Sequence, residues 1–375
     1  MQGRFYGELI DGGRAPHLVL GAVSGRSATT REVVAQRFPG VPYYTDAIEM
    51  MDSGRIDAVI ITVPHYLHPQ MAIDAMQRGL HVLVEKPLGV YTKQVRRMLD
   101  AAERTPDVTF AGMFNQRANP LYARLKAIID AGEIGAVRRV TWNITDWWRP
   151  QTYYDSSAWR GTWGGEGGGV LINQAAHQLD LWQWLFSAPH TVWARVPFGF
   201  GHDIAVDDDV TAVFGYEDAA TGVFVTGTHD MLGVDRLEVL GERGKVIVEN
   251  SSVATVRRLA KSMREYSETM DTAAVQRIVR GEMDWSELVT TETIEGTAEY
   301  GRDHAVVLEN FGRAVLFGEP LLAPAAEGAN AVRLSNAILL SGWLGREVPF
   351  DFDDDLFLTE LNNRIAAEGM FELRD

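Results

Sequence analysis

Short runs of apolar, mostly β-branched residues alternate with longer helical patterns up to about residue 115. The apolar run Ala58–Val63 is followed at Pro69–Arg78 by apolar residues at helical spacing, which is typical of a strand leading into a crossover helix. Repeated units of this kind build a parallel sheet with helices on both faces. This part of the chain therefore predicts a Rossmann-like, doubly wound α/β fold. Its other strands are expected at Leu18–Val23, His81–Val84 and Val108–Ala111, and its other helices at Thr30–Phe38 and Thr92–Ala102.

The pattern changes in the second half, where strands follow one another without crossover helices between them. Such an arrangement favours an open antiparallel sheet, and the whole second part reads as α+β. A boundary near Asn119-Pro120 predicts two domains, residues 1–118 and 119–375, while Arg258–Thr293 gives no clear pattern. The strands are expected at Val137–Ile144, Val192–Phe200, Val210–Tyr216, Gly222–Gly227, Arg236–Leu240 and Lys245–Glu249, and the helices at Asn119–Ala131, Leu171–Phe186, Tyr300–Phe317 and Glu327–Leu344.

Composition narrows the classes of partner. The 375 residues carry a formal net charge of −16, which would repel nucleic-acid phosphates and anionic lipids. No run approaches the roughly eighteen apolar residues of a spanning helix, and the first residues lack a signal-peptide layout. We expect a cytoplasmic protein with neither nucleic-acid nor membrane partners. With no Cys in the chain, any nucleophile or proton carrier must be His, Lys, Tyr or a carboxylate.

The beginning of the chain departs from a complete dinucleotide-binding pattern. Such a fold normally starts with an apolar strand running into G-x-G-x-x-G, where backbone amides receive a pyrophosphate. Here Gly3 and the residues after it resemble only the end of that fingerprint and the following helix. The first strand would then lie upstream of Met1, through a misassigned start codon or a genuine trimming, and its loss would leave a gap in the sheet. The alternative is that Gly3 belongs to a flexible terminus.

The residues after the first expected strand bear on the choice of coenzyme. NAD binders commonly place a carboxylate there for the ribose 2′-hydroxyl, whereas this chain has Ser24-Gly25-Arg26-Ser27. Without a carboxylate a 2′-phosphate is not repelled, and Arg26 can pair with it. The pattern favours NADP over NAD, although a solvated loop Arg would look the same.

Two loops leave strands at the edge of the sheet where doubly wound folds bind ligands. Lys86, held in Glu85-Lys86-Pro87, can donate to a substrate oxygen and stabilise alkoxide charge, although the same triplet occurs in surface turns. The segment from Thr62 to Pro69 contains His65 and His68, a pair that could suggest a metal. They flank a loop with no third ligand nearby, so we expect no metal site.

The most specific run is Glu166-Gly167-Gly168-Gly169 followed by an expected helix with Asn173, His177 and Asp180 on one face. Asn173 and Asp180 can orient the ring of His177 or hold its tautomer. A core histidine hydrogen-bonded within a helix would give the same pattern, so the residues alone leave both interpretations open.

Taken together, these motifs resemble a known family. Thr62 and Pro64 with His68, Glu85-Lys86-Pro87, and the glycine run leading to His177 and Asp180 occur in the order and spacing of the glucose-fructose oxidoreductase / inositol dehydrogenase (Gfo/Idh/MocA) family. The likeness covers nearly the whole chain. It implies an NAD(P)-binding first domain and a second domain for substrate binding and oligomerisation.

The resemblance also implies roles for particular residues. Lys86 would lie near both the nicotinamide and the reacting hydroxyl, and His177 would be the acid/base. The family often has Asp four residues before this His, where this chain has Asn173, so a simple Asp–His dyad is in doubt and Lys86 is expected to carry more of the proton transfer. Residues implied to line the cofactor, besides Gly3, Ser24, Arg26 and Lys86, are Thr62, Pro64, His68, Glu85, Asn115, Gln116 and Arg117.

The segment Asp146–Trp163 mixes aromatic rings with hydrogen-bonding groups, as sugar sites require. Some of these rings will be plain core or an oligomer contact. We expect Tyr153, Trp159 and Arg160 beside the substrate, together with Lys86, Asn173 and His177.

The resulting hypothesis is an NAD(P)-dependent oxidoreductase that moves a hydride between a nicotinamide and a secondary hydroxyl of a sugar, sugar derivative or cyclitol. Its partners would be a small carbohydrate and copies of itself in a homodimer or homotetramer. Two alternatives stay open: a redox-neutral NAD-dependent glycosidase, and a non-catalytic sensor of sugar or cofactor with the same fold.

Overall fold

The first third of the chain alternates short strands with helices, and every strand pairing within it is parallel. The computed structural model describes residues 2–297 and 299–375. The elements are α1 (Gln2–Asp11), β1 (Val23–Ser24), α2 (Ala28–Arg37), β2 (Tyr43–Tyr44), α3 (Ala47–Met51), β3 (Ala58–Ile61), η1 (His65–Leu67), α4 (His68–Met76), β4 (His81–Val84), α5 (Thr92–Glu103), β5 (Phe110–Gly112) and η2 (Asn115–Ala118).

The parallel sheet is divided in two. Within the described residues, β1 pairs with β2, while β3, β4 and β5 form a separate three-stranded sheet. The strand predicted at Leu18–Val23 is wrong for most of its length, because only Val23 and Ser24 pair, and Val19 is 89% exposed. A strand in the middle of a sheet needs a neighbour on each side to satisfy its amides and carbonyls. The described residues supply no strand that joins β1 to β3, so the parallel pairing is interrupted between them.

The second part is built on a nine-stranded sheet in the order β13-β12-β11-β10-β6-β9-β8-β7-β14. All pairings are antiparallel except that of β6 with β9, which is parallel and corrects the expectation of a wholly antiparallel sheet. The elements are α6 (Pro120–Asp130), β6 (Val137–Ile144), α7 (Gln151–Asp155), α8 (Ala176–Phe186), β7 (Thr191–Arg195), β8 (Asp209–Gly215), β9 (Thr221–Gly227), β10 (Asp235–Gly241), β11 (Gly244–Glu249), β12 (Val253–Leu259), α9 (Met263–Thr269), α10 (Thr272–Val279), η3 (Trp285–Leu288), β13 (Val289–Glu295), α11 (Arg302–Phe317), α12 (Ala325–Leu344), β14 (Val348–Pro349) and α13 (Asp354–Glu368).

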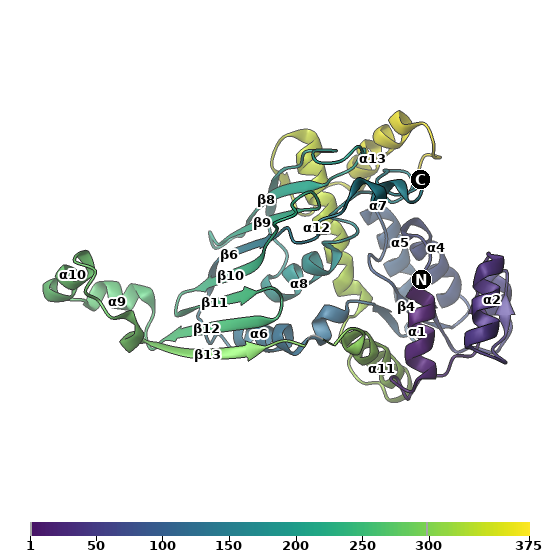
Figure 1. Ribbon diagram of the computed structural model, residues 1–375, viewed down its shortest axis with the longest axis horizontal. Helices are drawn as coiled ribbons and strands as arrows, with labels where there is room; N and C mark the ends of the chain where they lie inside the picture. The colour runs from purple at the N-terminus through teal and green to yellow at the C-terminus, as the bar shows by residue number, and fades with distance from the viewer. Residues whose placement is uncertain (1, 298) are drawn as a thin grey trace.

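Helices cover one face of this sheet and connect it to the parallel domain (Figure 1). Alternate residues of β8 and β9 are buried on this face, where Trp182 of α8 packs on Phe214 and Phe224 with ring centroids 4.8 and 5.9 Å apart. The long helix α12 contacts α8 and β7 on one side and α5 on the other. Because one hydrophobic core runs through both parts, the end of β4 is held beside the start of α8.

The segment between β12 and β13, which the sequence pattern left unassigned, forms a projecting arm of α9 and α10 (Figure 1). No residue of either helix is buried. Among the described residues, no helix combines the length and the apolar character needed to cross a bilayer.

Candidate active site

Lys86 lies directly after β4, at the carboxyl end of the three-stranded parallel sheet. Its Nζ donates to the backbone oxygen of Asn173 at 2.9 Å, so the side chain reaches from the parallel sheet to the segment before α8. Burial lowers the pKa of Lys86, while the carboxylates of Glu85 and Glu166 oppose that shift. An ammonium held in this way can donate to a ligand oxygen and stabilise negative charge on it.

His177 is the second residue of α8, and its ring packs edge-on against Phe114. The pKa of His177 lies well below its usual value, first because the ring is buried and then because Lys86 and His304 face it. The imidazole is therefore neutral at pH 7 and able to accept a proton. The fold thus brings an amine from the first part of the chain close to an imidazole from the second.

The helix that carries His177 starts later than predicted, at Ala176 rather than Leu171. Residues 170–175 form turns, so Asn173 precedes the helix and does not share its face with His177. The buried carboxylate of Asp207 holds these turns by accepting from the backbone amides of Gly169 and Leu171 at 2.7 and 2.8 Å. This tertiary contact anchors the turns to the loop before β8.

Asp180 does not orient His177, contrary to the interpretation of the sequence. Arg117 donates to both of its carboxylate oxygens, from Nε at 2.8 Å and Nη2 at 2.7 Å, and both side chains are almost fully buried. Nδ1 of His177 is buried and has no hydrogen-bond partner among the described residues. Arg117 is therefore part of the core, and the imidazole receives no support from a carboxylate.

Asn173 belongs to a network that also contains two of the expected substrate neighbours. Its Nδ2 donates to Glu166 Oε1 at 2.7 Å and to the hydroxyl of Tyr153 at 3.2 Å. Arg160 donates to the same hydroxyl at 2.6 Å and lies over the rings of Tyr153 and Trp159. An aromatic surface edged by a guanidinium, an amide and a phenol has the groups that bind a polyhydroxylated ring.

The glycine run is required by close packing around this network. A Cβ on Gly169 would lie 1.9 Å from the backbone oxygen of Asp207. Gly167 has a φ of +91°, and a Cβ there would lie 2.3 Å from Val90. Glycine avoids both clashes and allows the left-handed backbone. The run therefore brings Glu166 and Asn173 against the end of the parallel sheet.

Two of the expected cofactor residues, Gly3 and Thr62, bring the start of α1 close to the loop after β3. A Cβ on Gly3 would lie 3.0 Å from Thr62 Oγ1, so the helix terminus and that loop approach closely. The hydroxyl of the buried Tyr6 donates to Glu85, the residue before Lys86. Pro64 precedes the short helix η1, while Ser24 ends β1 and Arg26 is exposed in the following loop.

The ring of His68 is held between two backbone carbonyls. Its Nδ1 lies 2.8 Å from the backbone oxygen of Pro87, and its Nε2 lies 2.7 Å from that of Val63. Both ring nitrogens are thus occupied by the protein, and His68 connects the loops after β3 and β4. Nδ1 of the neighbouring His65 lies 3.2 Å from the backbone oxygen of Glu166.

Polar atoms without partners indicate where a ligand would be held. Asn115 Oδ1 and His304 Nδ1 are both buried without a hydrogen-bond partner among the described residues. The short helix η2, which contains Asn115 and Gln116, contacts α11 and α8, so these atoms gather near His177. An unsatisfied buried polar atom costs about 1–3 kcal/mol, which a hydrogen-bonding ligand would offset. With the helix terminus at Gly3, these residues fit a nicotinamide dinucleotide.

Sequence reasoning missed four residues of the site. Tyr6 and His304 come from helices at opposite ends of the chain, and no local pattern connects them to Lys86. Asp207 lies in a loop far from the glycines that it holds. Glu166 offered a signal, because it is an acidic residue immediately before the glycine run.

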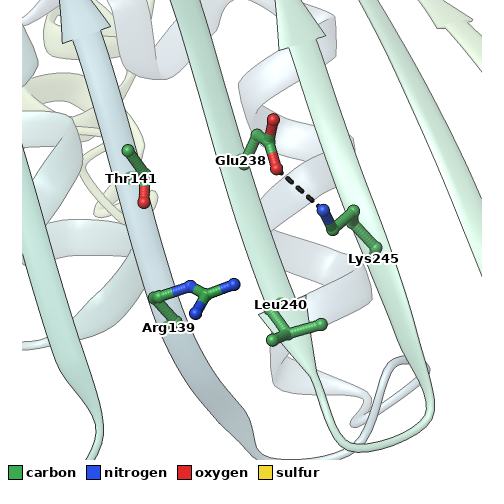
Figure 2. Close-up of a pocket in the computed structure, with 5 residues that line it drawn as sticks. All are labelled: Arg139, Thr141, Glu238, Leu240 and Lys245. Carbon is green, nitrogen blue, oxygen red and sulfur yellow. Dashed lines mark hydrogen bonds and ion pairs between the residues drawn. The ribbon is translucent and has the colours of Figure 1, made fainter.

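A separate hollow of about 280 Å³ lies on the other face of the nine-stranded sheet. Figure 2 shows its lining, where Lys245 Nζ bonds Glu238 at 2.8 Å beside Arg139. These side chains point away from the helix-covered face against which α8 packs. The hollow is therefore remote from Lys86 and His177.

Two family models match the chain. Residues 4–113 match a model described as an oxidoreductase family with an NAD-binding Rossmann fold. Residues 122–247 match the model of the GFO/IDH/MocA C-terminal domain.

The chain is also similar to named dehydrogenases, over different shares of its length. A D-xylose 1-dehydrogenase (NADP(+)) of Haloferax volcanii is 27% identical over 331 residues, which cover 88% of this chain and 91% of that enzyme. A myo-inositol 2-dehydrogenase of Thermotoga maritima is 24% identical over 221 residues, and the match spans only 62% of that enzyme and 57% of this chain. The structure of the WlbA dehydrogenase of Bordetella pertussis, solved with NADH and UDP-GlcNAcA, superposes with a TM-score of 0.70 at 26% identity, covering 88% of this chain and 90% of that one.

Proposed function

This chain belongs to the GFO/IDH/MocA family of oxidoreductases, and we propose that it is an NAD(P)-dependent dehydrogenase acting on a secondary hydroxyl of a sugar, sugar derivative or cyclitol. The observation that carries the proposal is that Lys86 both bonds Asn173 and faces His177. A dehydrogenase needs a group that stabilises alkoxide and a group that takes the hydroxyl proton, and these two residues supply both.

In the proposed mechanism, Lys86 donates to the oxygen of the reacting alcohol. The neutral imidazole of His177 takes the hydroxyl proton, and Lys86 stabilises the charge that develops as the proton leaves. A bound nicotinamide ring supplies the hydride acceptor. Because no carboxylate supports His177, Lys86 carries the larger part of the stabilisation.

The substrate class rests on the second part of the site. Tyr153, Trp159 and Arg160 offer aromatic faces and a planar cation, while Asn173 offers an amide. These groups suit a ring with several hydroxyls better than a simple aldehyde or diol. The xylose and inositol dehydrogenases among the relatives act on such rings.

We further propose that the coenzyme is NADP in preference to NAD. Ser24 ends β1 and Arg26 lies in the loop that follows, where a carboxylate would repel a 2′-phosphate, and the exposed Arg26 can pair with that group. The relative from Haloferax volcanii uses NADP, by its name.

A panel of monosaccharides, anhydrosugars and inositols, each assayed with NAD and NADP, tests both proposals. We expect coenzyme reduction at the nicotinamide absorbance band with at least one cyclic polyol, and a higher kcat/KM with NADP. Arg26→Ala should lower kcat/KM for NADP by about tenfold and leave that for NAD nearly unchanged, because the lost ion pair contacts only the 2′-phosphate. Sugar release without net reduction would contradict dehydrogenation, and a strong NAD preference would contradict the coenzyme assignment.

We also propose that the chain forms a homodimer or homotetramer through the bare face of its nine-stranded sheet. That face carries both signs of charge, with Arg139 and Lys245 near Glu238 (Figure 2). A second chain related by a two-fold axis can therefore place opposite charges against each other. Light scattering after gel filtration should give two or four times the 41.6 kDa of one chain. Reversing the charges of Arg139 and Lys245 to Glu should lower that mass, and a wild-type monomer would refute the interface.

A further inference from the structure

Glu166 is the most deeply buried ionisable group of the substrate-side network, with 2% of its surface exposed. Oε2 accepts from the backbone amide of Gly161 at 2.9 Å, and Oε1 accepts from Asn173 Nδ2 at 2.7 Å. The guanidinium of Arg160 lies 3.6 Å away. Burial raises the pKa of Glu166, while these donors and the ammonium of Lys86 oppose the shift and favour the carboxylate.

This carboxylate determines which way the amide of Asn173 points. An amide nitrogen has two hydrogens, and here one is directed to Glu166 and the other to the hydroxyl of Tyr153. A carboxylate can only accept, so the opposite orientation would set the amide oxygen against it. Asn173 Oδ1 is thereby left as an acceptor, without a donor in the described part of the chain, for a ligand hydroxyl.

The same residue connects Glu166 to Lys86. The backbone oxygen of Asn173 accepts from Lys86 Nζ, while its side chain donates to Glu166, so one residue lies between the two opposite charges. An opposite charge within a few ångströms of a buried amine stabilises the ammonium form.

We propose that Glu166 is a positioning residue of the active site, which fixes the Asn173 amide with its oxygen toward the substrate and keeps Lys86 as an ammonium. The inference rests on the proposed function for its consequence in catalysis. Its electrostatic part concerns the resting protein and can be measured without turnover.

Other ionisable groups also face Lys86, namely His65, His68, His177, His304 and Glu85. Burial lowers the pKa of the four imidazoles and so favours their neutral forms, while the carboxylate of Glu85 accepts from Tyr6 and from the Lys86 backbone amide. Glu166 is thus the negative charge that the second part of the chain contributes to Lys86.

The test titrates Lys86 by NMR in the full-length protein labelled with ¹³C at the lysine ε-carbons, since the chain has only five lysines. In Glu166→Gln the Lys86 midpoint should fall by about one pH unit, because the neutral amide no longer stabilises the ammonium. Glu166→Asp, which keeps the charge, should shift it less and covers the case in which the Gln variant does not fold. An unchanged midpoint in a folded Gln variant would overturn the proposal.

Glu368→Gln is the matched control. Glu368 accepts from the backbone amides of Trp163 and Gly164 in the same loop, yet it does not act on Lys86. This variant should leave the Lys86 midpoint unchanged, because the effect in Glu166→Gln is electrostatic, whereas equal shifts in both variants would show a merely structural role.

Kinetics give the second readout. In Glu166→Gln the alkaline limb of the pH profile of kcat/KM should move to lower pH by about one unit, because Lys86 loses its proton earlier. At pH values above the wild-type limb, kcat/KM should therefore be roughly tenfold lower than in the wild type. Wild-type protein without turnover on any polyol would refute the proposed function, while the titration would still decide the role of Glu166. Turnover in wild type with an unshifted profile in the variant would refute the inference alone.

Discussion

Lys86→Ala should lower kcat by about 10³-fold, while the dissociation constant of the coenzyme changes little. The ammonium lies at the end of β4, donates to Asn173 and faces His177, so its loss removes the cation that stabilises the developing alkoxide. Coenzyme affinity comes mainly from contacts along the dinucleotide, which this substitution leaves in place. Steady-state kinetics and fluorescence titration of NADPH measure the two effects separately.

Lys93→Ala is a suitable control for this substitution. Lys93 forms an ion pair with Asp355 at 2.8 Å on the surface, and its removal should leave kcat within about twofold of wild type. A Lys86→Ala enzyme that keeps a large part of the wild-type kcat would refute the assigned role, provided that its circular dichroism is native.

His177→Asn should lower kcat by about 10²-fold, less than the loss at Lys86. The imidazole has no carboxylate behind it, because Nδ1 lacks a partner and Asp180 is bound by Arg117. It is therefore a weaker base than one in an Asp–His pair, and its loss removes less of the stabilisation. A larger loss at His177 than at Lys86 would contradict this order.

The pH profile gives a second check on His177. A base must be unprotonated to act, and the pKa of His177 is lowered below its usual value near 6.5. The acid limb of kcat/KM should therefore lie below pH 6.5 in the wild type and disappear in His177→Asn. A wild-type limb at or above pH 6.5 would indicate a solvated imidazole.

The periodicity of the sequence was sufficient to predict the bounds of an element where those bounds depend on the element's own residues. Strands such as β6 and β4 were predicted to the residue, because alternation or continuous burial marks them directly. The prediction from periodicity was wrong where a contact with another part of the chain determines the local structure. Residues 18–22 have strand composition but pair with no strand in the described part of the chain, and the segment before Ala176 forms turns bound to Asp207.

The arm of α9 and α10 illustrates another limit of pattern reading. Both helices have apolar residues, yet none of them is buried, so no single face could be assigned to the core. Short helices of this kind are marginal on their own in water, and their pattern carries little information about the rest of the fold.

The amino-acid sequence alone determined the family, the two kinds of sheet and the identity of Lys86, His177 and Asn173 as candidate residues, because these features reside in local spacing. The tertiary structure alone decided their partners. Lys86 meets Asn173 across 87 positions, and Arg117 meets Asp180 across 63. A charged side chain binds whichever opposite group the backbone path brings within about 3 Å, and one-dimensional spacing does not contain that path. For this reason Glu166, from the second part of the chain, joins Glu85 in acting on Lys86, while Asp180 is bound in the core.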